Sequence, residues 1–281
     1  ISFTLLGEIE LSSLERAQRK PTDTLSSYEL LLKGKALHHK VQKDALLNAL
    51  TTFDDAIKAD EKNGQAYAWK ACALGQGLFR GYLEEDFNTV WKQAEDNLKK
   101  ARELNENDFE VHRLMSEVSL AMKDFRAAQR HSKICYEQVP NDPRVLSVYG
   151  EVCLRTGKVD EGLDAVKLAL EIDPVAQGKT NADPRHAAVI FGYYMARDKE
   201  GCLEQINNLE EIDFKSWLLT TKICRDEEHE FSNLDWFQEG KKLFSDKDFE
   251  KEVQDFRLNN DSATETLISF AKELFLSLIH I

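Results

Sequence analysis

Apolar residues between positions 143 and 176 recur at the spacing of two successive helix faces. A first set lies at i, i+3, i+4 and i+7, the spacing of one buried helical face: Leu146, Tyr149, Gly150 and Cys153. A second set follows after Gly157: Val159, Gly162, Val166, Ala169 and Leu170. Glycine interrupts a helix and proline cannot continue one, so Gly157 and Pro174 mark helix ends. The pattern predicts a helix pair at 143–156 and 159–172.

Small residues and prolines repeat this arrangement every 34 positions. The residues that share this spacing are Ala94, Ala128 and Gly162, then Ala101, Cys135 and Ala169, then Pro140 and Pro174. Small residues allow two helices to approach closely, so the period predicts a series of helix pairs. The pair before 143–172 is expected at 109–122 and 125–138.

Weaker copies of the pattern extend the series in both directions. Upstream, one unit is expected from Leu25 to Asp60, and another begins at Tyr67 and ends near Leu104. The second holds about 11 extra residues around 75–87, because Ala56 and Ala101 are 45 apart. Downstream, a shortened pair is expected at 188–197 and 201–210.

The period fades beyond Asp213, although helical patterns continue at 214–224, 234–244, 249–256 and 264–278. The last has an apolar stripe that either caps the array or forms a homodimer: Leu267, Phe270, Ala271, Leu274, Phe275 and Leu278. We therefore expect a lead-in at 1–24, an array of about five units at 25–212 and an acidic helical cap at 213–281.

The repeated residues resemble the tetratricopeptide repeat (TPR) family, whose 34-residue pattern places large, small and proline residues at fixed positions. In the best-matching unit these are Leu146, Tyr149, Gly150, Cys153, Gly162, Val166, Ala169 and Pro174. The resemblance implies an all-α fold in which helix pairs stack into a right-handed superhelix with a concave groove.

The resemblance also implies where a protein or peptide ligand would bind, namely on the first helix of each unit. The groove residues it assigns are Glu29, Lys33, Gln65, Glu110, Arg113, Glu117, Arg144, Ser147 and Glu151. Arg113 and Glu117 are expected to pair across one helical turn, as are Glu151 and Arg155. Glu117 and Glu151 stand where a receptor for chaperone tails needs Asn or a cation, which disfavours that partner class. An ordinary solvated groove wall is the alternative for all these residues.

Composition and charge exclude several classes of function. Of the 281 residues 42 % are hydrophobic and 31 % charged, and 13 glycines with 5 prolines are too few for a sandwich or barrel. The net charge is −13, and residues 198–281 carry 20 acidic and 10 basic side chains. We therefore expect no binding to nucleic acid or membranes. Five cysteines without a CxxC pair predict reduced thiols, no zinc site and a cytoplasmic location.

Candidate catalytic groups fail on spacing, so we expect neither an enzyme nor a cofactor. Gly178-Lys179-Thr180 lacks the first glycine of a phosphate-binding loop. The adjacent His38 and His39 do not share one helical face and are expected at the surface. His229 lies in an acidic run that is expected to be solvated rather than to bind metal, and no cysteine has an evident histidine partner.

The stretch from Leu14 to Gly34 resembles the run that precedes repeat arrays in bacterial multidomain regulators. In these proteins an adenylate or guanylate cyclase domain, or a winged-helix DNA-binding domain, lies N-terminal to the repeats. The chain begins at Ile1, and we expect it to be a piece of a longer protein. The prediction is a non-catalytic interaction scaffold, the C-terminal regulatory module of a cyclase. Its partner is another protein or the parent's own N-terminal domain, and the alternative is the effector region of a winged-helix regulator.

Overall fold

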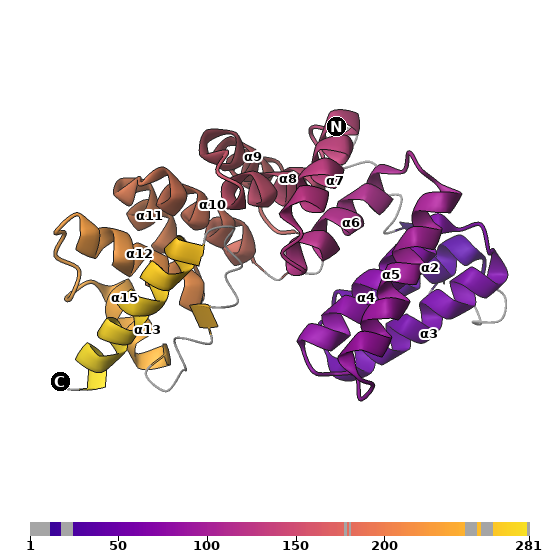
Figure 1. Ribbon diagram of the computed structural model, residues 1–281, viewed down its shortest axis with the longest axis horizontal. Helices are drawn as coiled ribbons and strands as arrows, with labels where there is room; N and C mark the ends of the chain where they lie inside the picture. Colours follow the sequence, from indigo (N-terminus) through magenta and orange to yellow (C-terminus); the bar gives the residue numbers. More distant parts are fainter. Residues whose placement is uncertain are drawn as a thin grey trace. The chain divides into compact units, whose positions relative to one another are not determined.

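The computed structural model describes residues 12–17, 25–176, 179, 181–244, 252–253 and 261–279. All regular secondary structure in these ranges is helical, which confirms the all-α expectation (Figure 1). The chain forms two compact units. Unit 1 comprises residues 1–119 and 130–139, and unit 2 comprises residues 120–129 and 140–281.

Unit 1 is built from helix pairs. Helix α2 (Ser27–His38) packs on α3 (Lys43–Ala59), and α4 (Gly64–Phe79) packs on α5 (Phe87–Leu104). Most of α6 (Phe109–Ala121) and the end of α7 (Phe125–Gln138) complete the unit. The core lies where α3 meets α2 and α4, around Phe53, Leu46 and Trp69.

Local hydrogen bonds explain where the unit 1 helices begin. Ser26 and Glu29 form a reciprocal cap at α2, in which each side chain accepts from the other residue's backbone N–H. Asn63 and Asp86 accept from the first turns of α4 and α5 in the same manner. Since Glu29 is part of a cap, one predicted groove residue already has a structural role.

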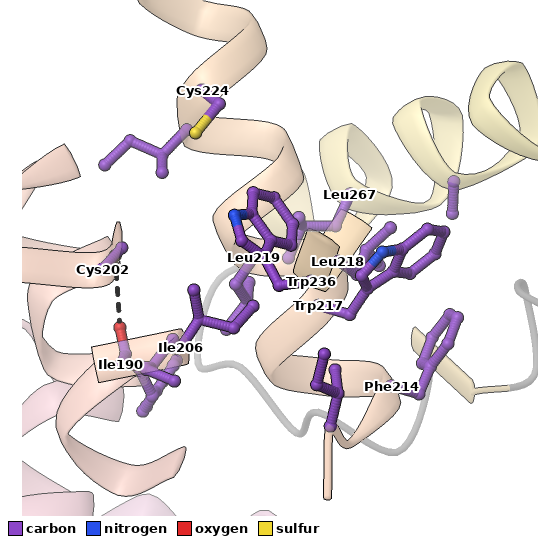
Figure 2. Packing of buried hydrophobic residues seen from close by; sticks show 14 of the residues in the cluster. Ile190, Cys202, Ile206, Phe214, Trp217, Leu218, Leu219, Cys224, Trp236 and Leu267 are labelled. Carbon is purple, nitrogen blue, oxygen red and sulfur yellow. Dashed lines mark hydrogen bonds between the residues drawn. The ribbon is translucent and has the colours of Figure 1, made fainter. Parts of the chain in front are cut away.

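Unit 2 contains the pair α8 (Pro143–Arg155) and α9 (Val159–Ile172), then α10 (Asp183–Ala196) and α11 (Lys199–Ile206). The remaining helices are α12 (Phe214–Asp226), α13 (Asp235–Phe244) and α15 (Asp261–Ile279). Their shared core gathers around Trp217, with Phe214, Leu218, Trp236 and Leu267 close by (Figure 2). The Cys202 thiol donates to the Ile190 carbonyl there, with 3.6 Å between sulfur and oxygen.

The stripe on the last helix is buried in this core. Leu267, Phe270, Ala271 and Leu274 are all at most 6 % exposed and pack against the same cluster as Trp217. Those four side chains would have to leave the core of unit 2 to meet a second copy of the chain.

The period of 34 corresponds to close helix contacts, as the sequence predicts. Ala94, Ala101, Ala128, Cys135 and Ala169 are completely buried. Within unit 2, a β-carbon added to Gly150 would lie 2.9 Å from the Gly162 carbonyl oxygen. One added to Gly162 would lie 2.9 Å from the Gly150 carbonyl oxygen, so α8 and α9 touch backbone to backbone.

Most predicted boundaries agree with the structure to within three residues, with three clear differences. Helix α11 ends at Ile206 rather than 210. The extra residues at 75–87 are divided between helix and connection, because α4 continues to Phe79 and residues 80–86 link it to α5. Helix α10 begins at Asp183 rather than 188, because Pro184 is compatible with a first helical turn. The predicted helix at 249–256 lies outside the described residues except for 252–253, as do the side chains of Phe275 and Leu278.

Replacing Gly150 by alanine should lower the free energy of unfolding by about 2 kcal/mol, because the new methyl group meets backbone that cannot move aside. Urea denaturation followed by circular dichroism measures this. Gly75→Ala is the matched control, since nothing lies within 4 Å of its added β-carbon and alanine favours a helix. A Gly150→Ala protein as stable as the wild type would contradict the close packing of α8 on α9.

Candidate binding surface

The predicted groove residues divide between the two units. Six lie on or beside the first helices of unit 1: Glu29, Lys33, Gln65, Glu110, Arg113 and Glu117. Three lie on α8 of unit 2: Arg144, Ser147 and Glu151. Within each unit the first helices are neighbours, since α2 contacts α4, and α10 contacts both α8 and α12.

A buried network of charges joins α2 to α6 in unit 1. The Arg113 guanidinium donates from Nε and Nη2 to the two carboxylate oxygens of Glu110, at 3.0 Å each. Its Nη1 donates to Glu117 at 2.5 Å, which confirms the predicted pair. Lys35 Nζ lies 4.0 Å from Glu110. Burial alone would lower the pKa of Arg113, but the two carboxylates raise it well above its ordinary value.

The network surrounds Trp69 of α4. Lys35 Nζ lies 5.3 Å and Arg113 Cζ 5.5 Å from the centroid of its ring, within the range of cation–π attraction. The His38 and His39 rings meet the indole at 5.5 Å, both edge to face. Most of this network is buried inside unit 1, since four of its side chains are at most 5 % exposed: Lys35, Glu110, Arg113 and Trp69.

A cysteine and a histidine lie in contact beside this network, whereas the sequence predicts no cysteine with a histidine partner. His38 Nε2 lies 3.7 Å from Cys72 Sγ, and His38 is only 6 % exposed rather than at the surface. The residues meet because α2 and α4 are neighbours. Burial lowers the pKa of His38 to about 3, with help from His39 and Arg113, and burial raises the pKa of the Cys72 thiol. Both groups are therefore neutral near pH 7, and the pair lacks the thiolate that nucleophilic catalysis needs.

The other predicted residues of unit 1 have separate surroundings. Gln65 Nε2 donates to Asp108 at 3.0 Å, and Lys33 is half-buried on α2. Glu29 lines a hollow of about 450 Å³ together with Ser13, Arg16, Ser26 and Tyr28. The structure therefore unites Glu110, Arg113 and Glu117 and leaves Glu29, Lys33 and Gln65 outside that network.

The three predicted residues of unit 2 lie along one face of α8. Arg144 Nη2 donates to Asp142 at 2.6 Å, and Ser147 is hydrogen-bonded to Arg185 of α10. Glu151 accepts from Arg155 at 2.7 Å, which confirms the second predicted pair. Arg185 is held in addition by Asp173, at 3.2 Å, although burial lowers its pKa overall.

Two basic residues beside this face are not among the groove residues predicted from the sequence. Arg155 of α8 and Lys215 of α12 both lie over the ring of Phe191 in α10, at 5.3 and 4.0 Å from its centroid. The spacing of four residues from Glu151 predicts Arg155 as an ion-pair partner only. The spacing of apolar residues does not indicate Lys215, because Lys215 lies near α8 only through the packing of α10 against α8 and α12.

The described ranges contain neither a metal-binding cluster nor a membrane-spanning helix. No group of three or more His, Cys, Asp or Glu side chains there could hold a metal ion. None of the helices described combines the length and the apolar character needed to cross a bilayer.

Comparison with known proteins identifies the type of fold. No protein-family model and no curated protein sequence matches the chain. Among solved structures, PilF of Pseudomonas aeruginosa is 14 % identical with a TM-score of 0.54, covering 79 % of this chain and 98 % of that one. The TPR protein TTC0263 of Thermus thermophilus is 18 % identical with a TM-score of 0.50, covering 72 % and 100 %. The APC/C hetero-tetramer Cut9–Hcn1 is 14 % identical with a TM-score of 0.62, covering 94 % of this chain and 45 % of that one. The fold is therefore of the all-α TPR type.

The buried network predicts a large effect of removing one partner. Arg113→Met should lower the free energy of unfolding by about 3 kcal/mol, because Glu110 stays buried without its guanidinium. Chemical denaturation at pH 7 measures this. Lys92→Met, which removes an ion pair whose side chains are 75 % and 62 % exposed, should leave stability nearly unchanged. Equal effects of the two substitutions would show that the network contributes little.

The lowered pKa of His38 predicts a loss of stability in acid. Between pH 6.5 and about 3 the unfolded chain takes up a proton at His38 that the folded chain refuses, so this contribution is present above pH 6.5 and falls below it. The stability of the wild type relative to His38→Phe should therefore fall by about 2 kcal/mol between pH 6.5 and 5. Denaturation curves across this range measure the difference, with His229→Phe as control. A constant difference would mean that His38 takes up its proton over the same pH range in the folded and unfolded chains.

Proposed function

We infer that this chain is a non-catalytic protein-interaction scaffold that binds a partner segment along its first helices. The observation that carries the proposal is the face of α8. There Arg144, Ser147 and Glu151 are each held by a partner side chain yet keep contact with solvent, with Arg144 30 % and Glu151 43 % exposed. Side chains fixed in this manner lose little entropy on binding.

Two further points support a scaffold. The Cys72–His38 pair, which looks most like a catalytic dyad, is neutral in both members. Cut9–Hcn1, which shares the fold, is a hetero-tetramer, so a protein of this type assembles with another chain.

The finer assignments stay predictions. Neither a cyclase nor a winged-helix regulator is among the similar structures described above, so the parent protein is proposed only on the stretch from Leu14 to Gly34. The cytoplasmic location, predicted from the five cysteines without a CxxC pair, and binding to the parent's own N-terminal domain are proposals as well.

Selection of peptides against the full chain tests the scaffold. Phage display should enrich peptides whose affinity, measured by fluorescence anisotropy, falls about fivefold in Arg144→Gln because a contact of the α8 face is lost. Lys158→Gln is the matched control, since Lys158 also pairs with a carboxylate but lies outside that face, just before α9. Equal affinities for both variants, or turnover of the bound peptides, would contradict the proposal.

A further inference from the structure

Helix α5 is longer at its start than the second helices of the two following pairs. It has 18 residues, whereas α7 and α9 have 14 each. Trp91 of α5 lies 34 residues before Phe125, which lies 34 residues before Val159. Phe125 and Val159 are the first residues of α7 and α9. The first turn of α5, which precedes Trp91, is therefore an addition to the common repeat and comes from the extra residues at 75–87.

The connection that leads into this added turn is fixed to the rest of unit 1. The Tyr82 hydroxyl donates to the carbonyl oxygen of Val41, between α2 and α3, at 3.3 Å. Leu83 packs over Gly77, since a β-carbon added to that glycine would lie 2.8 Å from the leucine side chain. Asp86 accepts from a backbone N–H of the added turn at 3.1 Å. Because the turn is held in place by these contacts, binding to it requires little ordering of the chain.

The added turn presents an aromatic pair. The Phe87 and Trp91 rings are stacked, with their centroids 6.3 Å apart and an angle of 11° between their planes. Phe87 is 47 % exposed, and the partly exposed Trp91 packs against the buried cluster around Val90. Fixed aromatic side chains of this kind are typical anchors of protein interfaces. The pair lies on a second helix, whereas the α8 face of the proposed function lies on a first helix.

Carboxylates surround the aromatic pair. Residues 84–96 contain five acidic side chains and one basic one, which is itself paired with a carboxylate at 3.4 Å. The acidic residues at 84–86 directly precede the pair and are exposed. Among the described residues, Glu84 makes no hydrogen bond or ion pair, and Glu85 accepts from Gln93 at 3.4 Å. This segment therefore carries an excess of negative charge next to its exposed apolar rings.

The excess of negative charge distinguishes between possible occupants of this surface. An anionic lipid surface would be repelled. A second copy of the chain, packed with its own α5 antiparallel, would bring Glu85 of one copy towards Glu95 of the other, and like charges in contact are unfavourable. A protein segment that carries positive charges beside an apolar stripe is complementary to both features.

We propose that Phe87 and Trp91, together with the acidic residues 84–86, form a docking surface for a basic amphipathic helix of a partner protein. Apolar side chains at i and i+4 of that helix pack on the two rings, which are themselves four residues apart on α5. Its lysine or arginine side chains pair with Glu84 and Glu85, while Asp86 continues to cap α5. The surface is separate from the α8 face, so the inference goes beyond the proposed function and does not depend on it.

Fluorine-19 NMR of the full chain labelled with 5-fluorotryptophan tests the proposal. The other three of the four tryptophans are at most 4 % exposed and serve as internal controls: Trp69, Trp217 and Trp236. Trp91→Phe identifies the Trp91 signal. The first probe is a capped helical peptide of about 15 residues with leucines at i and i+4 and lysines beside them. The second has glutamate in place of lysine, and the third is a scrambled lysine peptide without an apolar face.

We expect the lysine peptide to shift the Trp91 signal alone and saturably, and the other two peptides to leave it unchanged. Phe87→Ala should weaken the affinity about fivefold, because one of the two rings is lost. Leu243→Ala is the matched control, since Leu243 is also an exposed apolar residue, 54 % exposed on α13, and should leave the affinity unchanged.

Reversal of the charges provides a second test. The double variant Glu84→Lys, Glu85→Lys should bind the lysine peptide about fivefold more weakly and should gain binding of the glutamate peptide. Both residues are exposed, and circular dichroism checks that the variant folds. A general attraction of the lysine peptide to the net charge of −13 would not be reversed by two substitutions.

Several results would overturn the proposal. These are an unmoved Trp91 signal with the lysine peptide, an equal shift with the scrambled peptide, or an unchanged affinity in Phe87→Ala. A Trp91 signal that moves with protein concentration alone would assign the surface to a second copy of the chain, and one that moves with phosphatidylcholine vesicles would assign it to a membrane. The α8 face is tested separately by Arg144→Gln, so failure of either proposal leaves the other standing.

Discussion

The close approach of paired helices is the constraint on which the rest of this structure depends. Helices α8 and α9 touch through Gly150 and Gly162, where each glycine leaves no room for a β-carbon. Ala128 and Ala94 occupy the position of Gly162 in the two preceding pairs, at intervals of 34 residues, and both side chains are completely buried. Because the second helix of each pair packs closely against the first, the first helices of neighbouring pairs lie side by side within each unit. Their outward residues therefore share one surface.

That placement brings polar residues together that are far apart in the sequence. In unit 1 it produces a network in which Lys35 and Arg113 face Glu110 and Glu117 around Trp69. In unit 2 it places Arg155 and Lys215 on the same ring of Phe191, with Glu151 as their adjoining carboxylate. The same packing rule thus gives an Arg113 whose Nε, Nη1 and Nη2 are all hydrogen-bonded in unit 1, and in unit 2 an Arg155 whose Nη1 makes no hydrogen bond to a described residue.

The sequence was sufficient to predict the bounds of most helices and the ion pairs within one helix. Apolar spacing, Gly157 and Pro174 located α8 and α9, and the four-residue spacing predicted the pairs Arg113–Glu117 and Glu151–Arg155. Apart from the small residues of the 34-residue period, contacts between side chains of different helices were not predictable from these signals, because they depend on the rotation of each helix about its axis. His38 was therefore expected at the surface but is buried beside Cys72, and Lys215 was not recognised at all.

Burial alone does not identify a binding residue, and the two arginines show why. Arg113 is buried, but its donors at Nε, Nη1 and Nη2 are occupied by carboxylates of its own helix, so a ligand would have to displace an existing hydrogen bond. Arg155 is equally buried, yet Nη1 has no acceptor among the described residues, and the neighbouring Lys215 is easier to deprotonate than an ordinary lysine. The hydrogen bonds that each arginine makes, rather than its position in the repeat, therefore distinguish the two residues.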